Sequence, residues 1–227
     1  MIPLKDDNPI SSRPIVTYFL IGLCVVVFLM QLGSQSYRTG QLFYSYGLIP
    51  SVLMGHDQLP MDLYAIPAYM TIFSSMFMHG GWIHLIGNMW YMKIFADNIE
   101  DNLGARNFII FYILCGIGAA MTQVLMNTHS QVPMVGASGA IGGVLGAYLI
   151  NHPNARVLVL IPYIIITIIK IRALYVLGFW FILQFISSGG GIAYAAHIGG
   201  FVSGMILILF FNKKTKSKTK VIKGPWS

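Results

Sequence analysis

The sequence predicts an all-α membrane protein: a bundle of six transmembrane helices with a long, partly membrane-embedded first outer loop. Of its 227 residues, 56% are apolar and only 9% are charged, whereas a soluble domain carries about 25% charged residues. A transmembrane helix needs roughly 20 apolar residues, so the chain has room for six spans and for no sizeable soluble domain. Its hydrophobicity excludes a disordered chain, and its two cysteines exclude a disulfide-rich secreted scaffold.

Apolar runs mark the six spans. They lie near residues 14–32, 82–96, 107–126, 138–150, 173–186 and 192–212. The chain then divides into an N-terminal segment 1–13, a membrane domain 14–212 and a basic tail 213–227. The first run is expected to stay in place as an anchor, because acidic and basic residues mix before it and no clear signal-peptidase site follows it.

The stretch 157–169 reads VLVLIPYIIITII and does not fit the pattern of a span. It is too short to cross a bilayer as a helix, contains Pro162 and is rich in β-branched residues. We expect a hydrophobic loop or a hairpin lying at the membrane interface.

The basic residues predict the orientation of the bundle. With six spans, every one of the 14 Lys and Arg residues except Arg38 falls on one side, together with both termini. Positive residues collect on the cytoplasmic side, so both termini are expected in the cytoplasm and the membrane is expected to be the plasma membrane. The net charge of +7 therefore indicates topology, and no nucleic-acid partner is expected.

The segment 33–68 connects the first two spans on the outer side and is unusually long for a loop without structure. It contains aromatic residues such as Tyr37, Phe43 and Tyr64, which favour the headgroup layer of a bilayer. We expect short amphipathic segments partly embedded in the outer leaflet, either as a passive interfacial loop or with a function of their own.

Four polar residues lie where lipid should not tolerate them. His84 and Asn88 occupy positions i and i+4 of the second span, Ser138 begins the fourth, and His197 lies near the start of the sixth. Each alone can be explained as interhelical packing or as a local backbone hydrogen bond. However, all three spans run from outside to inside, so the four groups converge on one depth in the outer half of the bilayer.

These residue types suit nucleophilic catalysis. A serine hydroxyl becomes a nucleophile when a base within hydrogen-bond reach accepts its proton, and His197 can be that base for Ser138. His84, Asn88 and the backbone N–H of Ser138 can donate hydrogen bonds to an oxyanion. Because the acidic residues lie at other depths, the sequence predicts a Ser-His dyad rather than a triad.

Neither a metal ion nor another cofactor is expected. Cys24 and Cys115 fall mid-span, away from the histidines in depth, and are interpreted as buried thiols. Glycine pairs spaced as GxxxG, Gly139 with Gly143 and Gly200 with Gly204, predict that the fourth and sixth helices approach closely. A hydrogen bond between Ser138 and His197 requires that approach.

The ordered set of motifs resembles the rhomboid intramembrane serine proteases over nearly the whole membrane domain. The matching motifs are Met78-His79, His84-x-x-x-Asn88, Gly136-Ala137-Ser138-Gly139 and Ala196-His197-x-x-Gly200-x-x-x-Gly204. The resemblance implies Ser138 as nucleophile, His197 as general base, and His84 and Asn88 in the oxyanion hole, with His79, Gly136 and Gly139 in support. It also implies single-span membrane proteins as substrates, which would enter laterally past a gate formed by the fifth span and residues 187–191.

The chain departs from the family pattern at two places. Many members carry a Trp-Arg pair in the first outer loop where this chain has Met70-Thr71, and many carry an aromatic residue four positions after the serine where this chain has Gly142. A catalytically inactive rhomboid-like protein that binds transmembrane helices is the alternative function. A small transporter or channel fits less well, because intramembrane charges and internal repeats are missing from the sequence. The sequence predicts no oligomeric state.

Overall fold

Six longer helices account for most of the structure, a computed structural model that describes residues 1–38, 40–162, 166–186 and 193–211. They are α1 (Ile15–Gly33), α6 (Trp82–Leu103), α7 (Ala105–Met126), α8 (Ser138–Asn151), α9 (Ala173–Ile186) and α10 (Tyr194–Phe211). Each coincides with one of the six apolar runs. The basic tail 213–227 and the predicted gate residues 187–191 lie outside the described residues.

Within the described ranges, three helices are long and apolar enough to cross a membrane by length and composition: α1, α7 and α10. Helices α8 and α9 are apolar but shorter, at 14 residues each, and α6 is 22 residues long with a polar and acidic last turn. The chain is thus a mostly helical membrane protein, while the count of six spans stays a prediction.

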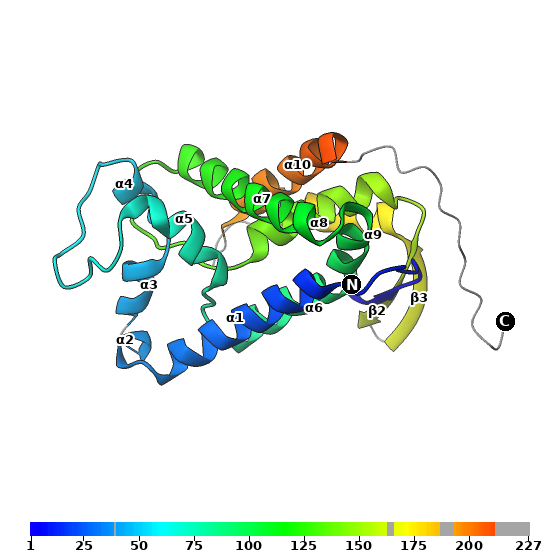
Figure 1. Cartoon of the computed structure of the whole chain (residues 1–227), viewed down its shortest axis with the longest axis horizontal. Coiled ribbons are helices and arrows are strands. Elements are labelled where there is room, and N and C mark those ends of the chain that lie inside the picture. The colour runs from blue at the N-terminus through cyan, green and yellow to red at the C-terminus, as the bar shows by residue number, and fades with distance from the viewer. Residues whose placement is uncertain (39, 163–165, 187–192, 212–227) are drawn as a thin grey trace.

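Short helices occur in the expected outer loop 33–68 and in the residues that follow it up to α6. In the loop are α2 (Gln35–Arg38), α3 (Gln41–Tyr46) and α4 (Pro50–Leu53), and η1 (Ala68–Met70), α5 (Thr71–Ser74) and η2 (Ser75–Phe77) follow. Backbone hydrogen bonds in both directions between Leu48 and Met134 tie this segment to the connection between α7 and α8. Figure 1 places it at one end of the bundle, opposite the β-strands.

A small antiparallel sheet closes the other end of the molecule. Strands β2 (Arg156–Pro162) and β3 (Ile166–Arg172) form the hairpin expected at 157–169, and β1 (Ile2–Asp6) pairs with β2 in the order β1-β2-β3. The prediction of an all-α protein is therefore incomplete. Strand β1 escaped prediction because its five residues include a proline and two charged residues, and its partner lies more than 150 positions away in the chain.

Two carboxylates at the end of α6 secure the start of α1. Glu100 is buried and accepts hydrogen bonds from the backbone N–H groups of Val16 and Thr17, at 2.9 and 2.7 Å, and from the Thr17 hydroxyl at 2.8 Å. Asp101 accepts bonds from the backbone N–H groups of Ser11 and Ser12. A carboxylate suits the position of Glu100 because the first N–H groups of a helix have no partner within the helix and carry partial positive charge, whereas Asp101 holds the residues that precede α1.

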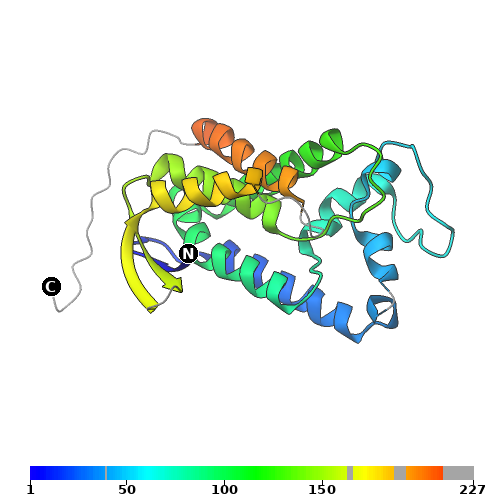
Figure 2. The same cartoon turned by 180° about the vertical axis from the view of Figure 1, so that it is seen from behind.

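Helices α8 and α10 approach each other closely through glycines, as the GxxxG spacing predicted. A Cβ added at Gly200 would lie 1.9 Å from the carbonyl oxygen of Gly139, and one added at Gly204 would lie 1.9 Å from that of Gly143. Both distances are far below van der Waals contact. Figure 2 shows α10 lying across α8 and α9, and Cys24 and Cys115 are buried free thiols in the neighbouring helices α1 and α7.

The variant Gly204→Ala is expected to lower the free energy of unfolding by about 1–3 kcal/mol, because its methyl group forces α8 and α10 apart. Gly22→Ala is the matched control: Gly22 lies in α1 with open space around it, and replacing a helical glycine by alanine stabilises a helix by roughly 0.5–1 kcal/mol. Unfolding in mixed detergent micelles, followed by circular dichroism, measures both. Equal midpoints for the two variants would contradict the close approach.

Candidate active site

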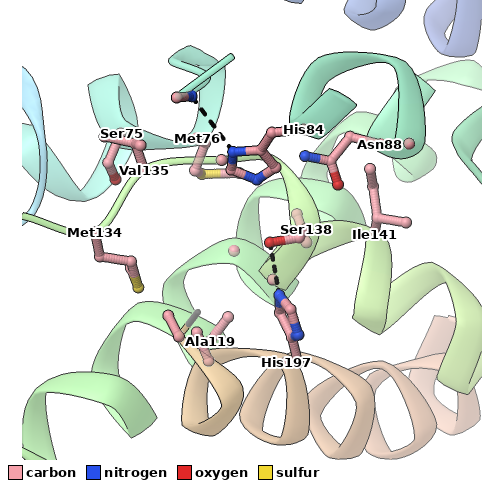
Figure 3. Close-up of a pocket in the computed structure, with 18 of the residues that line it drawn as sticks. Ser75, Met76, His84, Asn88, Ala119, Met134, Val135, Ser138, Ile141 and His197 are labelled. Carbon is pink, nitrogen blue, oxygen red and sulfur yellow. Dashed lines mark hydrogen bonds between the residues drawn. The ribbon is translucent and has the colours of Figure 1, made fainter. Parts of the chain in front are cut away.

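Ser138 and His197 are joined by a hydrogen bond at the point where two helices begin. Ser138 is the first residue of α8, and His197 lies in the first turn of α10. The Ser138 Oγ and the His197 Nε2 lie 2.8 Å apart (Figure 3). The glycine contacts between α8 and α10 bring together two side chains that are 59 positions apart in the chain.

His84 and Asn88 lie one turn apart on α6 and face the same space (Figure 3). The backbone N–H of Gly80 points at the His84 Nδ1 at 3.4 Å, so Nδ1 accepts and the neutral ring carries its proton on Nε2. The buried Nδ2 of Asn88 has no hydrogen-bond partner among the described residues. Both side chains therefore hold an N–H donor available to a bound group.

Gly136 is the residue that lets His84 approach Ser138. Its φ of +127° is one that residues with a side chain rarely adopt. A Cβ there would lie 2.7 Å from the His84 Nε2 and 3.6 Å from the Ser138 Oγ. Gly139 plays a different part: a Cβ there would lie 2.6 Å from the Cβ of Ala119 on α7, so this glycine allows α7 to pack against the start of α8.

These groups line one pocket of about 890 Å³. Its walls come from α6, α7, α8, α9 and α10 and from the segments before α6 and α8, and its polar lining includes Ser138, His197, His84 and Asn88. Pockets of this size hold a small ligand or a short length of peptide. The structure thus brings together the four polar residues that were expected to converge.

The sequence model of the Rhomboid domain matches residues 67–214, which is more than half of the chain. The chain belongs to the rhomboid family. It is 27% identical to the rhomboid protease GluP of Bacillus subtilis over 86% of this chain and 34% of that protein. It is 25% identical to the mitochondrial rhomboid protein 1 of Saccharomyces cerevisiae over 89% and 55%, respectively, and 31% identical to the mitochondrial RHOMBOID-like protein 6 of Arabidopsis thaliana over 60% and 41%.

This rhomboid spans about half, or less, of the length of those relatives. Among the similar proteins, several are named as proteases and others only as rhomboid-like. Together with the apolar helices, the family supports an integral membrane protein and a protease.

The departure at Gly142 has a physical explanation in this rhomboid. A Cβ at position 142 would lie 3.0 Å from the carbonyl oxygen of His197 and 3.5 Å from the backbone nitrogen of Phe201, so α10 leaves no room for an aromatic side chain. Instead, Trp180 of α9 lies beside the His197 ring, with ring centroids 5.9 Å apart and an interplanar angle of 33°. The aromatic neighbour of the histidine therefore comes from another helix.

Gln184 is a site residue that sequence reasoning missed. It lies near the end of α9, and its Oε1 is 2.8 Å from the His197 Nδ1. A polar residue inside an apolar run is by itself a reason for attention, and that criterion, applied to the fifth run, would have singled out Gln184. Its partner could not be read from the sequence, because only the packing of α9 brings it to His197.

His79 lies behind His84, between η2 and α6. Its backbone exchanges two hydrogen bonds of 3.1 Å with the side-chain amide of Gln31 on α1, and its ring meets the His84 ring edge-on at 5.2 Å. Burial, with a smaller contribution from His84, lowers the pKa of His79 to about 4, so the ring is neutral at physiological pH. The supporting part expected for His79 stays a prediction.

No cluster of three or more His, Cys, Asp or Glu side chains that could hold a metal ion occurs among the described residues. Cys24 and Cys115 have no exposed surface, and neither thiol lines the pocket.

The variant Gly136→Ala is expected to slow the reaction of Ser138 with a fluorophosphonate probe by about 10- to 100-fold, because a small displacement of reacting groups has effects of that size. The added methyl would meet His84 and strain the backbone. Gly33→Ala, in open space at the end of α1, is the control and should label at the wild-type rate. Unchanged labelling of Gly136→Ala would show that the reactivity of Ser138 does not depend on the close contact between His84 and position 136.

Proposed function

We propose that this rhomboid is an intramembrane serine endopeptidase that hydrolyses peptide bonds in or near the transmembrane segments of single-span membrane proteins. The observation that carries the proposal is the 2.8 Å contact between the Ser138 Oγ and the His197 Nε2 in a pocket between apolar helices. The proposal is also supported by the family of the chain, because relatives similar to it are named as proteases.

In the proposed mechanism, Ser138 is the nucleophile and His197 the general base. As the Oγ attacks the scissile carbonyl carbon, its proton passes to the His197 Nε2. His197 then gives that proton to the leaving amine, which leaves an acyl group on Ser138. A water molecule, activated by the same nitrogen, releases the acyl group and restores the hydroxyl. The chemistry needs no metal ion or cofactor.

The proposed oxyanion hole consists of the Ser138 backbone N–H, His84 and Asn88. The N–H of Ser138 is unpaired within α8 because it opens that helix, where the peptide dipoles favour negative charge. The proton on the His84 Nε2 and the unpaired Nδ2 of Asn88 supply two further donors. Donors fixed before the reaction stabilise the charge that develops in the transition state.

We further propose that α1 and α6 to α10 all cross the membrane, with both termini in the cytoplasm, a plasma-membrane location and a site that opens to the outside. At 14 residues, α8 would extend about 21 Å, less than the roughly 30 Å hydrocarbon layer. Its residues from Gly139 to Tyr148 are all buried, so protein surrounds this helix and it need not match the thickness of the bilayer.

The proposed entry route for a substrate helix passes α9. Its outward face is apolar and exposed to the surroundings, with Tyr175, Ile182 and Phe185 each more than half exposed, while Trp180 on its inner face lines the pocket. A single-span substrate in the lipid would meet this helix before it reached Ser138.

Ser138→Ala and His197→Ala are each expected to reduce cleavage of a model single-span substrate in proteoliposomes by at least about 1,000-fold, because each removes one half of the dyad. Ser45→Ala in α3 and His56→Ala in the connection between α4 and η1 are matched controls that lie outside the pocket. Labelling by a fluorophosphonate probe, measured in parallel, separates an active protease from an inactive rhomboid-like binder. Wild-type cleavage by Ser138→Ala would refute the proposal.

The proposed orientation predicts that a thiol at position 138 is reachable from outside. In intact cells, Ser138→Cys is expected to react with a membrane-impermeant thiol reagent, whereas the wild-type protein is not, since Cys24 and Cys115 have no exposed surface. Labelling of Ser138→Cys only after the cells are opened would place the site on the other side.

A further inference from the structure

Gln184 stands out on α9 as a buried amide on a helix that is otherwise apolar. It is 9% exposed, whereas Phe185 and Ile186 beside it are 64% and 70% exposed. Burying an amide without hydrogen bonds costs roughly 1–3 kcal/mol in proteins, so its place on the inner face calls for partners. It has two, one at each end of the amide.

The two partners fix which way the amide points. The Nε2 of Gln184 donates to the backbone carbonyl oxygen of Trp180 at 2.7 Å, and a carbonyl oxygen can only accept. The Oε1 therefore faces the His197 Nδ1, at 2.8 Å. Exchanging the amide nitrogen and oxygen would set two acceptors against each other at Trp180, so this orientation is the one with both bonds made.

The orientation of the amide in turn fixes the tautomer of His197. Because the Gln184 Oε1 can only accept, the proton of the neutral imidazole must be on Nδ1. The Nε2 is then unprotonated, and it is the nitrogen that lies 2.8 Å from the Ser138 Oγ. A base must present an unprotonated nitrogen to the hydroxyl, and the amide on α9 selects this form.

We propose that Gln184 is a positioning residue that orients His197 and holds it in the tautomer that can accept the Ser138 proton, so that the dyad is competent only when α9 is seated. The inference rests on the proposed function. Trp180, on the same helix, lies against the same ring. Both restraints on His197 from this side therefore come from α9, and a displacement of α9 removes them together.

A neutral amide suits this site better than the carboxylate of a triad. The ionisable side chains that face the His197 ring are His84 of α6 and Tyr194 of α10, while Ser138 faces it from α8 and Trp180 and Gln184 from α9. None of these neighbours is an aspartate, glutamate, lysine or arginine. An isolated carboxylate among them would lose its hydration without a cation to replace it, whereas the amide orients the ring without that penalty.

The test compares Gln184→Met with Gln184→Glu. Methionine keeps the length of the side chain and removes the acceptor. Cleavage in proteoliposomes is expected to show kcat lowered about 10- to 100-fold, the range seen when the hydrogen-bond partner of a metal-ligating histidine is removed, with KM nearly unchanged. Glutamate keeps an acceptor oxygen, so it is expected to recover much of the lost kcat. Its negative charge should also move the acid limb of the pH–rate profile to higher pH, because a carboxylate favours the imidazolium form.

Two controls separate positioning from packing. Gln35→Met makes the same substitution at an exposed position of α2, outside the pocket, and should keep wild-type kinetics. A second measurement needs no variant of Gln184: in the wild-type protein labelled with ¹⁵N-histidine, the His197 resonances, assigned with His197→Ala, should show Nδ1 as the protonated nitrogen.

Three results would overturn the inference: a kcat for Gln184→Met within twofold of wild type, equal losses for Met and Glu with an unchanged pH profile, or a proton on the His197 Nε2. Failure of the proposed function gives a different result, because wild-type cleavage would then not exceed that of Ser138→Ala.

Discussion

Helices α8 and α10 meet through their backbones, and the site depends on that contact. Between helices in lipid the hydrophobic effect gives little attraction, so close van der Waals packing has to hold them together. Gly200 and Gly204 present no side chain to the carbonyl groups of Gly139 and Gly143. The contact places the first turns of the two helices side by side, which leaves Ser138 and His197 at hydrogen-bond distance. A wider separation would still bury the apolar residues but would break this hydrogen bond.

Two histidines in one pocket hold their protons on opposite nitrogens. The Nδ1 of His84 faces the N–H of Gly80, a donor, so that its proton lies on Nε2. The Nδ1 of His197 faces the amide oxygen of Gln184, an acceptor, so that its Nε2 is free to accept. The same side chain can thus serve as a donor to an oxyanion in one position and as a base in the other. The difference arises from the one atom that faces Nδ1 of each ring, a donor nitrogen for His84 and an acceptor oxygen for His197.

Much of the arrangement follows from local patterns, and those patterns are visible in the sequence. Apolar runs located the six longer helices, the i, i+4 spacing placed His84 and Asn88 on one face, and β-branched residues around Pro162 indicated the hairpin. The four polar residues line one pocket as expected, while their catalytic roles are a proposal.

What escaped prediction depends on pairing over long distances in the chain. Strand β1 pairs with β2, Gln184 bonds to His197, and Glu100 bonds to the start of α1. In each case the residue was visible but its partner was set by tertiary packing. The family resemblance could not help at Gly142, because Trp180 of another helix lies beside the histidine there.

The partners of the N-terminal segment imply an order of assembly. Glu100 caps the first turn of α1, Asp101 holds the serines before it, and β1 pairs with a strand that begins at residue 156. A growing chain therefore exposes α1 while the N–H groups of its first turn still lack these partners, and the strand ahead of it has nothing to pair with until β2 has been made. The sheet at this end of the molecule therefore forms late in synthesis. A chain stopped before β2 contains all of α1 and α6 to α8, but its N-terminal strand has no pairing partner.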